Sequence, residues 1–287
     1  MSGGVDTGPR LSRWHSWPDP ADRGLRSWLR MGARIRDSRT IVVQLVHRDL
    51  RAQYRQSLLG WAWLVILPLI TVAFFTFLVG RRVLPIGELA IPYPAFALWN
   101  VIIWQLFAGT LMACTQSLAS AGPLVTRINF PKEAVIIAAA GKPLIEFAIK
   151  LAIVVPASMA FGVVPGWSAL PAIFVLVPML LLAIGIGFVF AVLNLVARDV
   201  EGVTGVIAGY GMLAGPILYP PPVTPPFDLV NTLNPFSPFL IAIQDLLIRG
   251  TVDDPQRLAG YVLLAATVFV GGWRFMYRVL PRALERA

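Results

Sequence analysis

The sequence has few of the side chains from which metal sites and covalent cross-links are built. Its 287 residues include one cysteine, Cys114, and two histidines, His15 and His47. A single cysteine cannot form a disulfide within the chain, and no cluster of cysteine and histidine is present to hold zinc. The sequence therefore predicts neither a structural disulfide nor a metal site.

Motifs that bind nucleotides or carry out hydrolysis are also missing. The phosphate-binding pattern GxxxxGK[ST] does not occur, and the one Gly-Lys pair, Gly141-Lys142, is followed by Pro143. Neither HExxH nor GxSxG is found. We therefore expect no catalytic residue and no cofactor in this chain. If the chain moves a cargo uphill, a partner must supply the energy.

Charge is scarce, and long apolar stretches take its place. Only 14% of the residues are charged, whereas 57% are hydrophobic. The hydrocarbon core of a bilayer is roughly 30 Å thick, so a crossing helix needs about 20 mostly apolar residues. This pattern predicts an all-α membrane protein with six transmembrane helices. The expected spans are residues 61–80, 94–115, 144–164, 168–196, 203–222 and 258–277.

The basic residues are distributed unevenly between the two sides of this predicted topology. Nineteen of the 24 lysines and arginines fall before the first span, in alternate loops, or at the end of the last span and beyond it. By the positive-inside rule both termini are cytoplasmic. A pI near 10.4 is also compatible with nucleic-acid binding. Because the basic residues lie beside the membrane in every inner segment, we favour membrane lipids as their partner and expect no nucleic acid.

The spans divide the chain into four regions. Residues 1–38 lack an apolar core and are expected to form a flexible cytoplasmic tail, and residues 61–280 form the transmembrane domain. Residues 281–287 are the predicted C-terminal cytoplasmic tail. Between tail and domain, residues 39–60 are predicted to form an amphipathic interfacial helix.

The interfacial helix is predicted from an apolar face beside a basic one. Val43, Val46 and Leu50 recur at helical spacing. Tryptophans follow at the expected headgroup depth, which favours a surface helix over a solvated lead-in to the first span. The other residues assigned to this helix are Arg48, Arg51, Tyr54 and Arg55.

The third span contains two charges. Glu146 and Lys150 are four residues apart, so we favour an intramembrane ion pair over a proton relay.

On the outer side, the fifth helix is interrupted. Prolines between residues 219 and 226 must end the fifth helix. Residues 234–250 hold an apolar run too short to cross the bilayer, which predicts short re-entrant or interfacial outer helices. Backbone at such depth must contact protein or line an aqueous cavity.

Several short motifs in this order resemble one transporter family. They are QYRQSLLGWAW (53–63) leading to Pro68, Phe130-Pro131, Leu193-Asn194, Arg198-Asp199-Val200, Pro216-Ile217-Leu218-Tyr219 and Asn234-Pro235-Phe236-Ser237-Pro238. The chain resembles the membrane (permease) subunit of type-2 ABC transporters that export polysaccharides such as O-antigen, capsule or teichoic acid. The resemblance covers roughly residues 40–280.

The resemblance implies an assembly in the bacterial cytoplasmic (inner) membrane. Two copies of this subunit would form a homodimer over two copies of a separate ABC ATPase, which would bind ATP and magnesium. The cargo would be a lipid-linked glycan. Residues 118–131 would couple the two kinds of subunit, and the residues assigned to this contact are Arg127, Phe130, Pro131 and Lys132.

The same resemblance implies an aromatic lining, because sugar rings present C–H faces that stack on aromatic side chains. The candidates for the substrate pathway are Tyr93, Trp99, Trp104, Phe107, Tyr210 and Tyr219. Each could equally be a packing residue or a membrane anchor. Two alternatives stay open: a permease of the same architecture for a small lipophilic drug or a lipid, and a receptor or passive channel.

Overall fold

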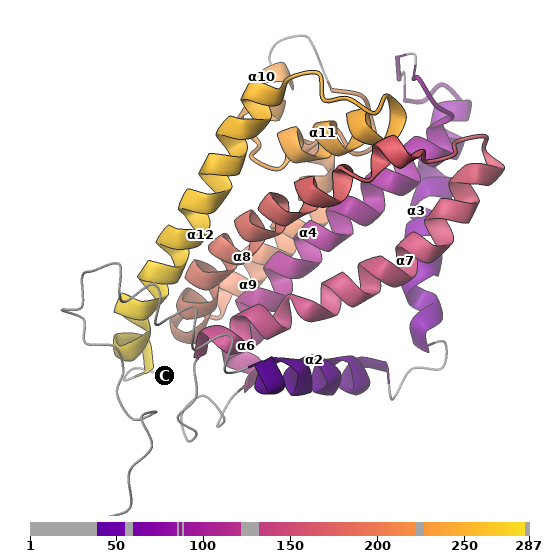
Figure 1. Cartoon of the computed structure of the whole chain (residues 1–287). Helices are drawn as coiled ribbons and strands as arrows, with labels where there is room; N and C mark the ends of the chain where they lie inside the picture. The colour runs from indigo at the N-terminus through magenta and orange to yellow at the C-terminus, as the bar shows by residue number, and fades with distance from the viewer. Residues whose placement is uncertain are drawn as a thin grey trace, which may run out of the picture.

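A computed structural model describes residues 39–54, 60–84, 86–87, 89–121, 132–221 and 227–284. The described chain is a helical bundle with α2 across one end and α10 and α11 at the other (Figure 1). The elements are α2 (Arg39–Tyr54), η1 (Gly60–Ala62), α3 (Trp63–Gly80), α4 (Tyr93–Ala121), α6 (Lys132–Ala139), α7 (Gly141–Ala160), η2 (Trp167–Ala169), α8 (Ala172–Val196), α9 (Asp199–Ala214), α10 (Phe227–Leu233), α11 (Ser237–Ile248) and α12 (Pro255–Leu284). We name the two ends of the bundle the α2 end and the α11 end. The predicted tail at residues 1–38 lies outside the described residues.

Five of the six predicted spans are long and apolar enough to cross a membrane. They are Gly60–Gly80, Tyr93–Ala121, Lys132–Ala160, Ala172–Val196 and Pro255–Leu284. The predicted span 203–222 is instead the 16-residue α9. At 1.5 Å per residue α9 reaches roughly 24 Å, less than the roughly 30 Å core. The multi-pass helical architecture is confirmed, whereas a sixth crossing stays a prediction.

The end of α9 has a local cause. Gly215 is in an extended conformation with φ −115° and ψ 164°. The next residue is Pro216, which lacks an N–H and cannot continue the helical ladder. The apolar α11 follows as a 12-residue helix. Figure 1 places it at the α11 end, across the upper part of the bundle. The predicted short outer helices are therefore present as α10 and α11, while their re-entry into a membrane stays a prediction.

The core of the bundle lies along α4. Of the 18 residues in the most apolar stretch of this helix, 83% are buried, against 11% in the corresponding stretch of the span that contains α3. The helix contacts α3, α7, α8 and α9. Because lipid solvates apolar side chains as well as protein does, burial here reports position in the bundle and not hydrophobicity. α4 is therefore the element against which α3, α7, α8 and α9 are positioned, whereas α12 packs on α8.

Glycines bring α8 close to its neighbours. A Cβ added to Gly272 of α12 would lie 2.1 Å from the carbonyl oxygen of Gly185 in α8. A Cβ added to Gly187 would lie 2.4 Å from the Cβ of Cys114 in α4. Small residues permit this approach, which supplies the van der Waals contact that holds membrane helices together.

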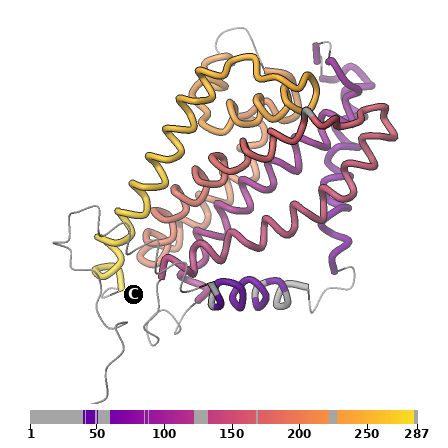
Figure 2. Tube along the Cα trace, viewed as in Figure 1, coloured from indigo at the N-terminus to yellow at the C-terminus, as the bar shows by residue number. Residues whose placement is uncertain are grey.

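The surface helix α2 packs on α6 and α7 (Figure 2). Leu45 is buried, and a Cβ on Gly141 would lie 2.6 Å from a methyl group of Val46. Val43, from the predicted apolar face, is 56% exposed. The apolar residues of α2 are thus divided between a face against protein and a face turned outward, because α6 and α7 lie on one side of the helix.

Candidate functional site

The polypeptide directly after α9 is held by a buried polar network at the α11 end. Asn100 of α4 is fully buried, and its Nδ2 donates to the carbonyl of Ile217 at 3.0 Å. Its Oδ1 accepts from Nε2 of Gln244 in α11 at 2.9 Å, and Gln244 also donates to the carbonyl of Pro216 at 3.3 Å. These carbonyls have left the helical ladder, so side chains must supply their donors. We call these four groups the α4–α11 lock.

Two of the predicted pathway tyrosines help to hold the same non-helical segment, residues 215–219 after α9, which we call the break. The hydroxyl of Tyr93 donates to the carbonyl of Leu218 at 3.1 Å, and the hydroxyl of Tyr219 donates to that of Leu213 at 2.8 Å. Asn234 donates to the carbonyl of Ala214 at 3.4 Å. The break is therefore fixed to α4, to α11 and to the end of α9 by side chains of α4 and α11, together with Asn234 before α11 and Tyr219 in the break itself.

Two further predicted aromatics form a cluster with Phe236. The ring centroids of Trp104 and Phe107 each lie 5.0 Å from that of Phe236. Nε1 of Trp104 donates to the carbonyl of Ala208 at 3.1 Å, and a Cβ on Gly211 would lie 2.6 Å from the Trp104 ring. Trp104 therefore packs directly against α9.

The six predicted pathway residues thus differ in exposure within one chain. Tyr93, Trp99, Trp104 and Phe107 are each less than 9% exposed, while Tyr210 is 70% exposed. Tyr219 is partly buried. A role in a substrate pathway stays a prediction for all six.

A stripe along α4 was missed from the sequence. Between Ala95 and Leu118 almost every residue of α4 is buried. The partly exposed ones, apart from Ala113, recur every three or four residues, which places them on one face. We call this face the α4 polar stripe; it consists of Gln105, Gly109, Met112 and Gln116 and continues to the exposed Ser120. The available signal was the pair Gln105 and Gln116, which lie eleven residues, or about three helical turns, apart in an apolar span.

The stripe is connected to the start of α9. Nε2 of Gln116 donates to Oε1 of Glu201 at 2.7 Å, and the backbone N–H of Glu201 donates to Oδ1 of Asn194 at 3.2 Å. Asn194 is buried, and its Nδ2 donates to the carbonyl of Thr115 at 3.4 Å. The Leu193-Asn194 motif therefore joins α8, α9 and α4.

At the α2 end, only some of the predicted coupling residues are described. Lys132 begins α6 and is buried, and Arg48 of α2 is exposed. Arg51 and Tyr54 are also part of α2. The remaining assigned residues, Arg55, Arg127, Phe130 and Pro131, lie outside the described residues. Their roles stay predictions.

The charged residues of α7 extend over two helical turns. Oε1 of Glu146 lies 3.9 Å from Nζ of Lys142. Lys150 is 8% exposed, and its ammonium group interacts electrostatically with Glu146. The structure thus places an i,i+4 ion pair at Lys142–Glu146, and the predicted Glu146–Lys150 ion pair stays a prediction.

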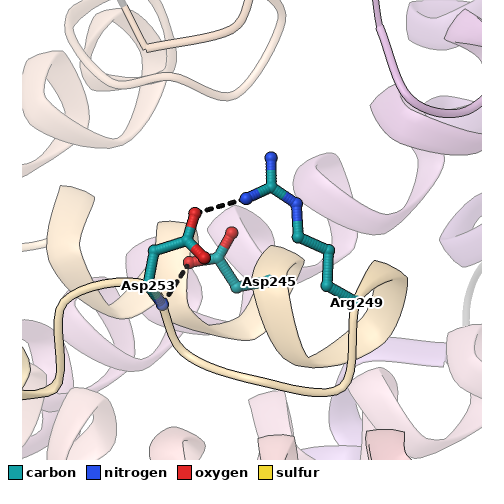
Figure 3. A network of polar contacts seen from close by, with 3 residues as sticks. All are labelled: Asp245, Arg249 and Asp253. Atoms are coloured by element: carbon teal, nitrogen blue, oxygen red, sulfur yellow. Dashed lines mark hydrogen bonds and ion pairs between the residues drawn. The ribbon is translucent and has the colours of Figure 1, made fainter.

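A second charged group connects α11 to α12. Arg249 pairs with Asp253, whose backbone N–H donates to Oδ2 of Asp245 at 3.4 Å (Figure 3). Burial raises the pKa of the Asp245 carboxyl above its usual range, and the Asp253 N–H opposes that rise. Within the described residues no three His, Cys, Asp or Glu side chains are placed to hold a metal ion. The Arg249–Asp253 pair and the bond from the Asp253 N–H to Asp245 together fix the turn that precedes α12.

Comparison with known proteins agrees with this architecture. The chain is 24% identical over 218 residues to the O-antigen export system permease protein RfbA of Klebsiella pneumoniae, covering 74% of this chain and 82% of that protein. It is also 24% identical over 242 residues to the protein of the same name from Myxococcus xanthus, covering 82% of this chain and 89% of that protein. The family described as "ABC-2 type transporter" matches residues 40–248. The chain therefore belongs to the ABC-2 type transporter family of membrane proteins.

Proposed function

We propose that this chain is the permease subunit of an ATP-driven exporter that moves a lipid-linked polysaccharide out across the bacterial cytoplasmic membrane. The observation that carries the proposal is its similarity, over 82–89% of their length, to relatives named O-antigen export permeases. Family membership supports the role of a transport subunit without catalytic residues. Orientation, with both termini in the cytoplasm, follows from the basic residues.

The active assembly would be a homodimer built on α3 and α9. Both helices contact α4, and each exposes a stripe at spacings of three, four and three residues. The exposed stripes are Leu67, Ile70, Phe74 and Phe77 on α3, and Val203, Val206, Tyr210 and Leu213 on α9. Such spacing suits contact between helices of two subunits. The α4 polar stripe, which adjoins α9, would then lie near the seam, where its amides can bond glycan hydroxyls.

Energy would come from two copies of a separate ABC ATPase at the α2 end. The segment between α4 and α6 would contact the ATPase, with Arg127 and Phe130 as the principal residues. Because α6 continues into α7, and Asn194 ties α4 to α8 and α9, a movement at this end has a packed route to the remaining helices. Tyr277 of α12 donates to Glu133 of α6 and extends the route to α12.

The cargo can be tested in cells from which the chain has been deleted. We expect lipid-linked glycan to accumulate inside the cell and surface glycan to disappear, with both restored by the wild-type chain. Unchanged surface glycan together with increased sensitivity to a lipophilic drug would contradict the proposal and favour drug export.

The route can be tested with Gln105→Leu. Losing one hydrogen bond of about 1 kcal/mol between the Gln105 amide and a glycan hydroxyl should lower the rate of surface delivery roughly fivefold. Thr267→Leu is the matched control, because Thr267 is an exposed polar residue on α12 whose hydroxyl bonds only its own helix, to Leu263 at 2.8 Å. Equal delivery by the two variants would remove the α4 polar stripe from the pathway.

A further inference from the structure

The helices α7 and α8 diverge toward the α11 end (Figures 1 and 2). An open apolar groove lies between them. Residues 163–170 cross the wide end of the gap. The groove has a volume of about 910 Å³, at the upper end of the roughly 300–1,000 Å³ of ligand pockets. We call it the α7–α8 groove; its lining includes Leu151 and Val155 of α7, Leu176 and Leu180 of α8, Trp99 of α4 and Leu247 of α11.

The lining has the chemistry of a site for a hydrocarbon chain. It consists of aliphatic, aromatic, proline and glycine residues, with no charged side chain. Ile173 and Val177, which belong to the α8 wall, are 58% and 54% exposed. Since both walls belong to candidate membrane spans, the mouth of the groove faces the hydrocarbon region.

A helix from a second copy fits this groove poorly. Membrane helices approach one another through small residues. The glycines of α8 are already used inside the chain, because Gly185 packs on α12 and Gly187 on Cys114 of α4. The groove itself is lined mostly by large side chains, with alanines such as Ala148 and Ala172 between them. A flexible chain fills such a hollow better than a helix does.

The dimensions agree with one acyl chain of one bilayer leaflet. On α7 the lining extends from Leu144 to Val155, which is roughly 17 Å of helix. One leaflet contributes about half of the roughly 30 Å hydrocarbon core. At the wide end Trp167 is 88% exposed, as is typical of tryptophan at headgroup depth.

The groove is separate from the proposed glycan route. Its α4 residues are Trp99 and Ile103. Ile103 and Gln105, two residues apart on a helix, point about 160° away from each other. A lipid in the groove therefore lies on the opposite side of α4 from the α4 polar stripe. We accordingly take the occupant to be a phospholipid of the bilayer and not the lipid-linked glycan.

The floor of the groove adjoins the α4–α11 lock. Trp99, Leu247 and Pro165 line the groove and also a cavity of about 10 Å³ that touches Asn100 and Gln244. We propose that the α7–α8 groove binds one acyl chain of a bilayer phospholipid, which packs on Trp99 and Leu247 and thereby supports the lock.

The test uses the full chain with a photo-crosslinking phenylalanine analogue at Leu151. The matched position is Ile153, which is 39% exposed but lies outside the groove. Each protein is placed in nanodiscs of phosphatidylethanolamine and phosphatidylglycerol, moved into detergent and irradiated, and its adducts are identified by mass spectrometry. We expect about fivefold more phospholipid adduct at position 151, since a chain held by the groove survives detergent exchange. Leu176 offers a second groove position if the first variant does not fold.

A pair of filling variants supplies the control. Ala148 lines the groove, whereas Ala152 is exposed one turn further along α7 and does not. Ala148→Trp should reduce the adduct to the level at position 153, and Ala152→Trp should leave it unchanged. Equal adducts at 151 and 153, crosslinks to a second copy of the chain, or an adduct insensitive to Ala148→Trp would each overturn the proposal. The nanodiscs hold no glycan lipid, so these results are independent of the cargo.

Discussion

Asn100 offers the sharpest test of how the break after α9 is held. Replacing it with leucine keeps a similar volume but removes the donor to Ile217 and the acceptor for Gln244. The Ile217 carbonyl then has lost its side-chain donor, while Gln244 keeps the Pro216 carbonyl. One buried group left unsatisfied costs about 1–3 kcal/mol. We therefore expect Asn100→Leu to lower the free energy of unfolding by about 2 kcal/mol.

This estimate exceeds the average for hydrogen bonds between membrane helices, which is about 0.6 kcal/mol. The difference has a physical reason. In a regular helix a lost interhelical bond leaves the backbone ladder intact, whereas the Ile217 carbonyl lies outside the ladder and depends on a side chain. Asn100 also joins three separate elements, so its loss affects more than one contact.

The assay is unfolding by sodium dodecyl sulfate in mixed micelles, followed by circular dichroism. The variants are Asn100→Leu, Gln244→Leu and the double variant, whose coupling energy should be about 1 kcal/mol because the two side chains bond directly. Gln105→Leu is the control: it lies on the same helix, and its Oε1 is buried without a partner among the described residues, so the substitution should leave the free energy of unfolding unchanged or raise it. A cost for Asn100→Leu no larger than that of the control, or strictly additive single variants, would refute this account of the lock.

Two other predictions concern helix packing and pH. Gly272→Ala should destabilise the chain by about 1–3 kcal/mol, because the added Cβ meets the Gly185 carbonyl. In the control Gly271→Ala the added Cβ meets nothing within 4 Å, so this substitution should be neutral or mildly stabilising. Thermal unfolding in detergent compares the two variants. Burial raises the pKa of Asp245, so the native chain binds a proton there more tightly than the unfolded chain, and its contribution to stability falls as pH rises from the unfolded value through the folded one. Asp245→Asn should therefore raise the melting temperature at pH 7.5 but not at pH 4, and a gain that is equal at both values would contradict the assigned cause.

The membrane class and most of the span positions could be predicted from local sequence. Apolar length is a local property, and the predicted spans 94–115, 168–196 and 258–277 fall within or overlap α4, α8 and α12. The prolines between residues 219 and 226 predicted an end of the fifth helix, but α9 already ends at Ala214, before Pro216. The predicted span 203–222 was shifted and too long, because hydropathy continues past Ala214 while the backbone leaves the helix at Gly215.

The functional surface depended on tertiary structure. Aromatic content suggested a lining, but Trp104 and Phe107 are packed against Phe236, more than 120 residues away along the chain. The α4 polar stripe is recognisable only when the rest of α4 is known to be buried. The same spacing on a lipid-facing helix would have another meaning.

The sequence by itself determined that the chain resides in a membrane, where most of its long helices fall and which family it belongs to, since each depends on local hydropathy or on motifs in order. Tertiary structure decided that α4 is the centre, that Asn100 and Gln244 hold the break after α9, and that α7 and α8 diverge around a groove. These features join residues separated by 117 and 144 positions. No local pattern specifies such partners, because a buried amide finds its donor or acceptor only when the helices have packed.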